Sequence, residues 1–181
     1  MKYTLTALVE NKPGVLNRVA SLFRRRNFNI DSLTVGRTHT PEVSRMTIVM
    51  DGSELDAAKV EKNLYKLVNV IQVDQLNDKP AVSRDLALIK VAVAGNTRAE
   101  VMQLCDIFRA RIVDVSQNSV IIEVTGDEAK IESLTSMLQP IGIIEMVRTG
   151  VVAMGRGEHT LSTNGYRPTA KPNGNGYKSV I

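Results

Sequence analysis

One stretch near the start of the chain combines residue types that could bind a small charged ligand. Residues 10–16 (ENKPGVL) lie where an alternating pattern gives way to helical spacing. The first amides of a helix lack partners within the helix and lie at its positive end, so they can bind a carboxylate. Gly14 has no Cβ and lets a ligand approach the backbone closely. Asn11 can donate and accept hydrogen bonds, which suits the paired ammonium and carboxylate of an amino acid.

A simpler explanation of the same residues stays open. Proline and glycine are common at ordinary helix starts, and asparagine is a common helix cap. On this alternative, residues 13–14 only begin a helix and Asn11 caps it. Residue spacing by itself favours the simpler explanation over a binding site.

The other residue types that carry chemistry are poorly placed for it. Cys105 falls on the apolar face of an expected helix, where a cysteine is usually a buried structural thiol. His39 and His159 have no triad or metal partner nearby in sequence, and no Cys/His spacing suggests zinc. Gly155 and Gly157 follow a strand but open no helix, so they do not form a phosphate loop. We therefore expect no catalytic residues and no metal ligands in this chain.

The elements that position these residues follow a pattern that occurs twice. Apolar spacing predicts strands at 3–10, 28–36, 44–50 and 70–76, with helices after Pro13 and after Ser53. The same order recurs, with strands at 86–94, 112–115, 120–124 and 143–147 and helices after Thr97 and after Asp127. Two β-α-β-β-α-β units predict an α+β chain of two tandem ferredoxin-like domains, each a four-stranded antiparallel sheet with two helices on one face.

Local signals refine these elements. A change of side-chain parity predicts a bulge near residues 31–32. Ser53 with Asp56, and Thr97 with Glu100, predict capping boxes at two helix starts. The Glu100 carboxylate would then occupy the positive helix end that a ligand carboxylate needs. We therefore expect only the first domain to bind an amino acid.

Composition sets the domain boundaries and excludes several classes of protein. We expect a first domain at 1–77, a polar linker at 78–85, a second domain at 86–155 and a disordered tail at 156–181. No apolar run approaches the roughly 18 residues of a membrane span. One cysteine and the absence of a signal-peptide layout indicate the cytoplasm. A net charge of +4 is too small to argue for nucleic acid.

Several segments give the sequence a specific resemblance. Residues 3–76 resemble the ACT domain, the amino-acid-sensing βαββαβ module, and residues 8–19 look like its signature loop. Residues 28–35 and 44–48 narrow the match. Together with 107–115 and 148–151, they are similar to the small, regulatory subunit of acetolactate synthase (acetohydroxyacid synthase). The resemblance covers roughly residues 1–160.

The resemblance implies a homodimer whose ACT domains pair side by side and bind valine at their interface. Leucine or isoleucine would be the other branched-chain effectors of feedback inhibition. The effector site would join one chain's Asn11, Gly14, Val15 and Leu16 to the partner's Asn29 and Ile30. The second domain would contact and activate a large catalytic subunit. That partner would carry thiamine diphosphate, magnesium and FAD, and this chain no cofactor.

Two other functions remain as alternatives. A free-standing ACT sensor of another enzyme or of transcription would lack the activating surface of the second domain. RNA-binding modules share βαββαβ, but they stack bases on aromatic residues of the two central strands. Here the expected central strands, 5–9 and 44–50, show Met, Ile, Leu and Thr, and aromatic residues are 4% of the chain. We expect neither a nucleic acid nor a membrane as partner.

Overall fold

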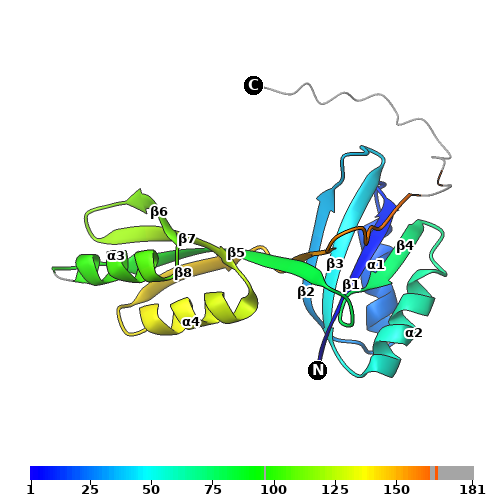
Figure 1. The fold of residues 1–181 in the computed structure, drawn as a ribbon, viewed down its shortest axis with the longest axis horizontal. Helices are drawn as coiled ribbons and strands as arrows, with labels where there is room; N and C mark the ends of the chain where they lie inside the picture. Colours follow the sequence, from blue (N-terminus) through cyan, green and yellow to red (C-terminus); the bar gives the residue numbers. More distant parts are fainter. Residues whose placement is uncertain (96, 164–165, 167–181) are drawn as a thin grey trace.

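The computed structural model describes residues 1–95, 97–163 and 166, which form two sheets that each carry two helices (Figure 1). The first domain contains β1 (Lys2–Glu10), α1 (Val15–Arg25), β2 (Ile30–Arg37), β3 (Val43–Asp51), α2 (Glu54–Leu64) and β4 (Val70–Gln75). Its strands are ordered β2-β3-β1-β4, with antiparallel pairing throughout. This is the ferredoxin-like arrangement that the sequence predicts.

The second domain repeats the arrangement with one addition. It contains β5 (Ala81–Ala92), α3 (Thr97–Ile107), β6 (Arg111–Val115), β7 (Ser119–Gly126), α4 (Glu128–Leu138) and β8 (Ile143–Arg148), ordered β6-β7-β5-β8. A further strand, β9 (Val152–Gly155), pairs with β5 and was not predicted. None of the described helices is long and apolar enough to cross a membrane. The α+β class with two tandem ferredoxin-like domains is confirmed.

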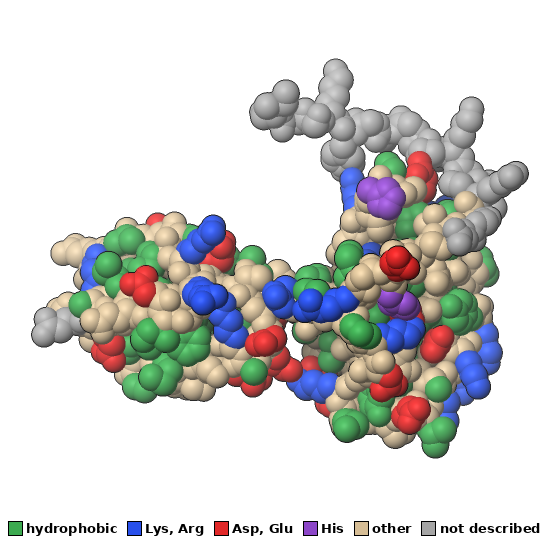
Figure 2. All heavy atoms as spheres, in the orientation of Figure 1, with side chains coloured by type: hydrophobic (Ala, Val, Ile, Leu, Met, Phe, Trp, Pro, Cys, Tyr) green, Lys and Arg blue, Asp and Glu red, His purple; other side chains and the backbone are tan. Residues whose placement is uncertain are grey.

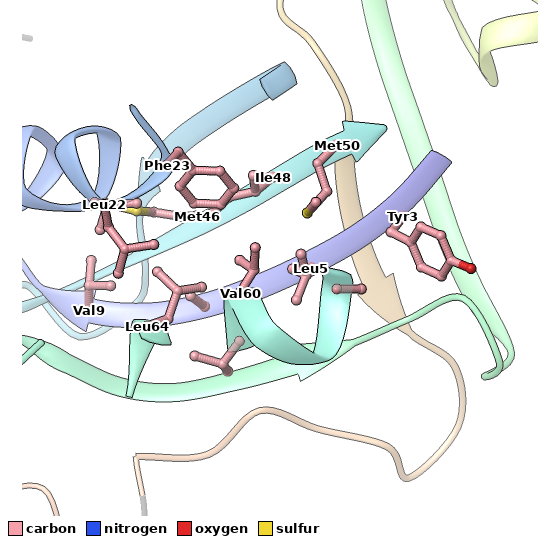
Figure 3. Close-up of a cluster of buried hydrophobic side chains, with 14 of the residues drawn as sticks. Tyr3, Leu5, Val9, Leu22, Phe23, Met46, Ile48, Met50, Val60 and Leu64 are labelled. Atoms are coloured by element: carbon pink, nitrogen blue, oxygen red, sulfur yellow. The ribbon is translucent and has the colours of Figure 1, made fainter. Parts of the chain in front are cut away.

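The core of the first domain lies between its sheet and its two helices (Figure 3). Alternate side chains of β1 and β3 point to this side, because strand side chains alternate between faces. They meet apolar residues spaced along the inner faces of α1 and α2. The principal members are Leu5, Val9, Leu22, Phe23, Met46, Ile48, Met50, Val60 and Leu64. Burying each of these large side chains stabilises the fold by about 1.5–3 kcal/mol. The core therefore holds β1 and α1 in place on either side of the turn that joins them.

Most local signals are confirmed. The β2–β3 register shifts between Ile30 and Ser32, at the expected bulge. Ser53 and Asp56 form the expected capping box at the start of α2, and Asp127 caps α4 by accepting from the Lys130 amide. These residues act over short sequence distances, which explains why the pattern alone located them.

The capping box expected at the start of α3 is wrong. Thr97 is the first residue of the helix rather than its cap. Its hydroxyl accepts from the amide of Ala94 and donates to the carbonyl of Ala94, both at 2.9 Å. The Thr97 hydroxyl is therefore used in the turn before the helix, whereas a capping box would need it to accept from the Glu100 amide. Glu100 still lies in the first turn of α3.

The segment expected to be a linker, residues 78–85, contains the beginning of a long strand. Ala81 to Arg84 pair with β9, whereas β5 pairs with β7 from Asp85 onward. One strand thus runs from the first domain into the second (Figure 1). The local sequence pattern did not predict a strand here, because this stretch contains polar residues. Strand formation depends on the pairing partner, and the partner β9 lies about 70 residues away in sequence.

After β8 the chain returns across the first domain in what we call the crossing segment, residues 149–163. It runs over the sheet face opposite α1 and α2 (Figure 1). Its hydrogen bonds reach edge and central strands: Thr34 Oγ1 to the Thr149 carbonyl (3.2 Å), Arg45 Nη2 to the Ala153 carbonyl (2.8 Å), and the Ser162 amide to Gln72 Oε1 (2.7 Å). His159 Nε2 lies 2.5 Å from Asp74 Oδ2. The segment therefore contacts β2, β3 and β4.

The crossing segment explains why the outer face of this sheet is buried. Thr6 is fully buried there, and Leu8 and Thr47 are 5% and 3% exposed. These residues alternate with the core residues of the same strands, so the helices cannot be what covers them. The strand face that an RNA-binding module would use for stacking is thus covered by the chain itself.

Residues 156–163, expected to belong to a disordered tail, have defined contacts in the structure. The amide of Arg156 donates to the Pro80 carbonyl at 2.8 Å, in addition to the His159 and Ser162 contacts. The sequence pattern did not predict these contacts, because backbone groups and polar side chains form them. Such contacts leave no regular spacing of apolar residues in the sequence. The remainder of the expected tail, residues 164–165 and 167–181, lies outside the described residues.

A buried ion pair lies at the junction of the two domains. Asp85 is 2% exposed. Arg148 donates to it through Nε at 2.7 Å and Nη2 at 2.5 Å, and the Thr149 hydroxyl donates at 3.1 Å. Removing one partner of a buried pair is costly because the other charge is left uncompensated.

We predict that Asp85→Asn lowers the free energy of unfolding by about 2–4 kcal/mol, because the positive charge of Arg148 then lacks its negative partner. Urea denaturation checks this. The control is Asp31→Asn, whose partner Lys2 lies 3.1 Å away at the surface. That change should cost less than about 1 kcal/mol. Equal losses in the two variants would contradict the role given to Asp85.

Candidate functional site

The start of α1 differs from the other helix starts that the structure describes in having no compensating side chain. Its N-cap is Gly14, no side chain caps it, and its first turn contains no acidic residue. By contrast, Ser53 caps α2 and Asp127 caps α4, and both helices carry acidic residues in their first turns. The Val15 amide donates to the Lys12 carbonyl at 3.4 Å, whereas the amides that follow it and the positive end of α1 are available to an external anion.

The backbone at Gly14 requires glycine. Its φ is +83°, in the left-handed region that other residues adopt at a cost. A Cβ built there would meet nothing within 4 Å, so the space beside the helix start is open. Next to it, Val15 is buried in the core and holds the turn, whereas Leu16 is 46% exposed. A ligand at this turn would meet both backbone amides and an apolar side chain.

Asn11 does not cap α1, so the simpler explanation of this residue is wrong. Its backbone amide donates to the Glu42 carbonyl at 2.7 Å. Its side-chain nitrogen donates to the Pro41 carbonyl at 2.9 Å. Asn11 therefore holds the β2–β3 loop beside the turn that leads into α1.

A buried carboxylate lies immediately before the turn, at the end of β1. Glu10 is 6% exposed. Asn69 Nδ2 donates to it at 2.5 Å, the Tyr166 hydroxyl donates at 2.8 Å, and Lys12 Nζ lies 3.1 Å away. Arg18, on α1, hydrogen bonds to the side-chain oxygen of Asn69. This network ties the end of β1 to α1 and to a residue near the C-terminus.

The network keeps Glu10 ionised. Burial alone would raise the pKa of Glu10, but hydrogen bonds from Tyr166, Asn69 and Lys12 outweigh it and hold that pKa below its usual value. Burial and the bond to Glu10 raise the pKa of Tyr166 to about 12. Tyr166 thus keeps its proton near neutral pH and remains the donor. Glu10 is a fixed charge that positions the turn.

Asn29 and Ile30 do not join the turn within one chain. Through β3, Ile30 pairs with Met50, and Met50 pairs with Tyr3 near the beginning of β1. Asn11 follows the other end of β1, roughly 25 Å away at about 3.3 Å per residue. The structure therefore brings Asn11, Gly14, Val15 and Leu16 together and leaves Asn29 and Ile30 at the opposite end of the sheet. A site containing all six needs two copies of the chain.

Sequence reasoning missed the parts of this network that lie far apart in the chain. Asn69 and Tyr166 follow Glu10 by 59 and 156 positions. The available signal was Glu10 itself, a carboxylate at the end of a mostly apolar strand. A carboxylate that is buried at such a position requires polar partners. Within residues 1–95, 97–163 and 166, no three His, Cys, Asp or Glu side chains are placed to hold a metal ion.

Two family profiles match the chain. One, described as an AHAS small subunit-like ACT domain, matches residues 5–72. The other, described as the small subunit of acetolactate synthase, matches residues 84–157. The first match thus covers the first domain and the second match covers the second domain.

Whole proteins of the same kind are similar along nearly their full length. The chain is 53% identical over 157 residues to the probable acetolactate synthase small subunit of Archaeoglobus fulgidus, covering 87% of this chain and 98% of that one. It is 48% identical over 161 residues to the acetolactate synthase small subunit of Mycobacterium leprae, covering 89% and 95%. The crystal structure of the small subunit from Thermotoga maritima matches with a TM-score of 0.82 and 42% identity, covering 88% and 99%.

We predict that Tyr166→Phe raises the pKa of Glu10 towards its ordinary value of about 4.3, because one stabilising donor is lost. An NMR titration of the Glu10 carboxyl measures this. The control is Tyr65→Phe, since the Tyr65 hydroxyl donates to the Val73 carbonyl and not to Glu10.

The same substitution has a pH-dependent effect on stability. A carboxyl with a lowered pKa in the folded state stabilises the fold above its ordinary pKa and loses that contribution as pH falls through the folded pKa. The deficit of Tyr166→Phe against the parent should therefore be largest near neutral pH and shrink below about pH 4.3. An unchanged Glu10 pKa in Tyr166→Phe would show that Tyr166 does not act on Glu10.

Proposed function

The chain belongs to the family of acetolactate synthase small subunits, and from this we propose that it is the non-catalytic regulatory subunit of an acetolactate synthase. In this role it raises the activity of a large catalytic subunit and makes it subject to feedback inhibition by valine or another branched-chain amino acid. The observation that carries the regulatory part is the uncapped, open start of α1 at Gly14.

We propose that the effector is bound between two copies of the chain. The amides at the start of α1 would hold its carboxylate, and Asn29 of the partner subunit, with strand-edge carbonyls, its ammonium. Strand β2 is at the edge of its sheet and can pair with β2 of a second copy. Antiparallel pairing would bring the Asn29 end of one chain towards the Gly14 end of the other. Charge-assisted hydrogen bonds of about 1.5–3 kcal/mol each, minus binding costs, correspond to micromolar to millimolar affinity.

We propose that the second domain contacts the catalytic subunit. Apolar side chains remain at the surface of its sheet, including Val113, Val115 and Val147, which are 51%, 60% and 57% exposed. Exposed apolar groups of this kind favour a protein partner. The thiamine diphosphate, magnesium and FAD would belong to that partner. This chain would supply contacts and regulation rather than reacting groups.

Regulation requires that valine bind two states of the assembly with different affinity, because a ligand bound equally by both shifts nothing. Two connections between the domains could transmit such a bias. One is β5, which is continuous from the first domain into the second. The other is the crossing segment, which starts at the Asp85–Arg148 pair and continues over the sheet.

We predict that Gly14→Asp abolishes valine inhibition of the reconstituted enzyme while activation persists, because the new carboxylate repels the effector's own at the helix start. The matched control is Gly14→Asn, which has the same size and tolerates positive φ but carries no charge. It should keep inhibition, with a higher valine concentration at half effect.

Three outcomes decide the assignment. Retained inhibition in Gly14→Asp would contradict the site. Equal loss of inhibition in both variants would point to backbone strain instead of charge. Loss of activation together with a collapsed circular dichroism spectrum would show that the substitution unfolds the domain.

A further inference from the structure

A cavity lies on the sheet face of the first domain that the crossing segment covers. It has a volume of about 610 Å³ and opens between the crossing segment, the β2–β3 loop and the outer face of the sheet. That face is opposite the helices, so the cavity and the start of α1 lie on different faces of the sheet, although both adjoin the β2–β3 loop. The volume is within the roughly 300–1,000 Å³ typical of small-molecule sites.

The ionisable side chains that line this cavity are mostly basic, and several serine and threonine residues lie beside them. Arg37, His39 and Arg45 approach from the sheet and the β2–β3 loop. Figure 2 shows histidine and basic side chains on this side of the domain. Arg45 is half-buried, and burial lowers its pKa, so its charge is poorly solvated. Arg45 Nη2 already donates to the Ala153 carbonyl, and the Asp74 charge also acts on the guanidinium. An anion beside Arg45 would accept a charge-assisted hydrogen bond from its other N–H groups.

The acidic lining group, Asp74, already has partners of its own. Asp74 pairs with Lys79 and with His159, which lies 2.5 Å away. Although burial opposes ionisation, these two partners hold the pKa of Asp74 below its usual value. An incoming ammonium group would therefore have to compete with Lys79 and with the His159 ring for this carboxylate. The cavity is suited to an anion and unsuited to the zwitterion of an amino acid.

Apolar side chains lie on both sides of the cavity, among serine and threonine residues that also line it. Strands β1 and β3 contribute Leu8 and Val43, and Leu76 follows β4 directly. The crossing segment contributes Met154 and Leu161. A ligand with an apolar body would bury it against these side chains. Contacts on both sides would also hold the crossing segment against the sheet.

We propose that this cavity binds a small organic anion that has an apolar body and no ammonium group. Its carboxylate or phosphate pairs with Arg45, and its body lies between the sheet and the crossing segment. The site is separate from the turn at Gly14, so it does not depend on the function proposed above.

The test uses 3-methylbutanoate, which is valine without its ammonium group, with the full chain saturated in L-valine. Calorimetry should detect binding with a dissociation constant of about 10 mM or tighter. Inorganic phosphate, an anion with no apolar body, should bind at least about tenfold more weakly. Phosphate binding as tight as that of 3-methylbutanoate would overturn the proposed ligand class.

Two variants separate this cavity from the effector site. Arg45→Gln should weaken 3-methylbutanoate binding by about tenfold or more, through loss of a charge-assisted hydrogen bond. Gly14→Asp should leave it unchanged. If Arg45→Gln proves unfolded by circular dichroism, Arg37→Gln takes its place with a smaller expected loss. No binding to the parent, displacement by valine, or loss in Gly14→Asp would each overturn the proposal.

Discussion

A four-stranded sheet with both helices on one face leaves its other face uncovered, and in the first domain the chain solves this with its own C-terminal part. The crossing segment buries Thr6, Leu8 and Thr47, which the helices cannot reach. Because it begins at the Asp85–Arg148 pair, the same stretch that completes the first domain also holds the second domain to it. The crossing segment thus both covers the sheet and connects the two domains. A ligand that shifts its contacts with the sheet is therefore expected to shift its contacts with the second domain as well.

The network around Glu10 extends this dependence to the proposed effector site. Tyr166 follows the crossing segment and hydrogen bonds to Glu10, which directly precedes the turn into α1. The turn is therefore held from three directions: the core through Val15, the β2–β3 loop through Asn11, and the C-terminal part through Tyr166. Among the residues that the structure describes, no side chain caps the helix start itself. Such a rigid turn with an open positive end suits a ligand that is bound and released without refolding the domain.

The sequence predicted what depends on neighbours in the chain and missed what depends on distant ones. The βαββαβ order, the bulge near residue 31 and the caps at Ser53 and Asp127 follow from local spacing, and the structure has them. The strand character of residues 81–84 and the order of residues 156–163 depend on partners that no local pattern reveals. At the proposed site, the pattern indicated a turn whose helix start has no side-chain cap in the structure, but it assigned Asn11 as a possible cap and did not identify Tyr166 as a partner of Glu10.

We propose that a complete effector site requires two chains, because Asn29 and Asn11 lie at opposite ends of one sheet. The most direct measurement is calorimetric titration of valine into mixed dimers of Gly14→Asp with Asn29→Lys, each of which should bind poorly alone. A shared site predicts that a mixed dimer regains one intact site, built from the unaltered turn of one chain and the unaltered Asn29 of the other. Failure of every mixed dimer to bind valine, with both chains folded and paired, would contradict the account.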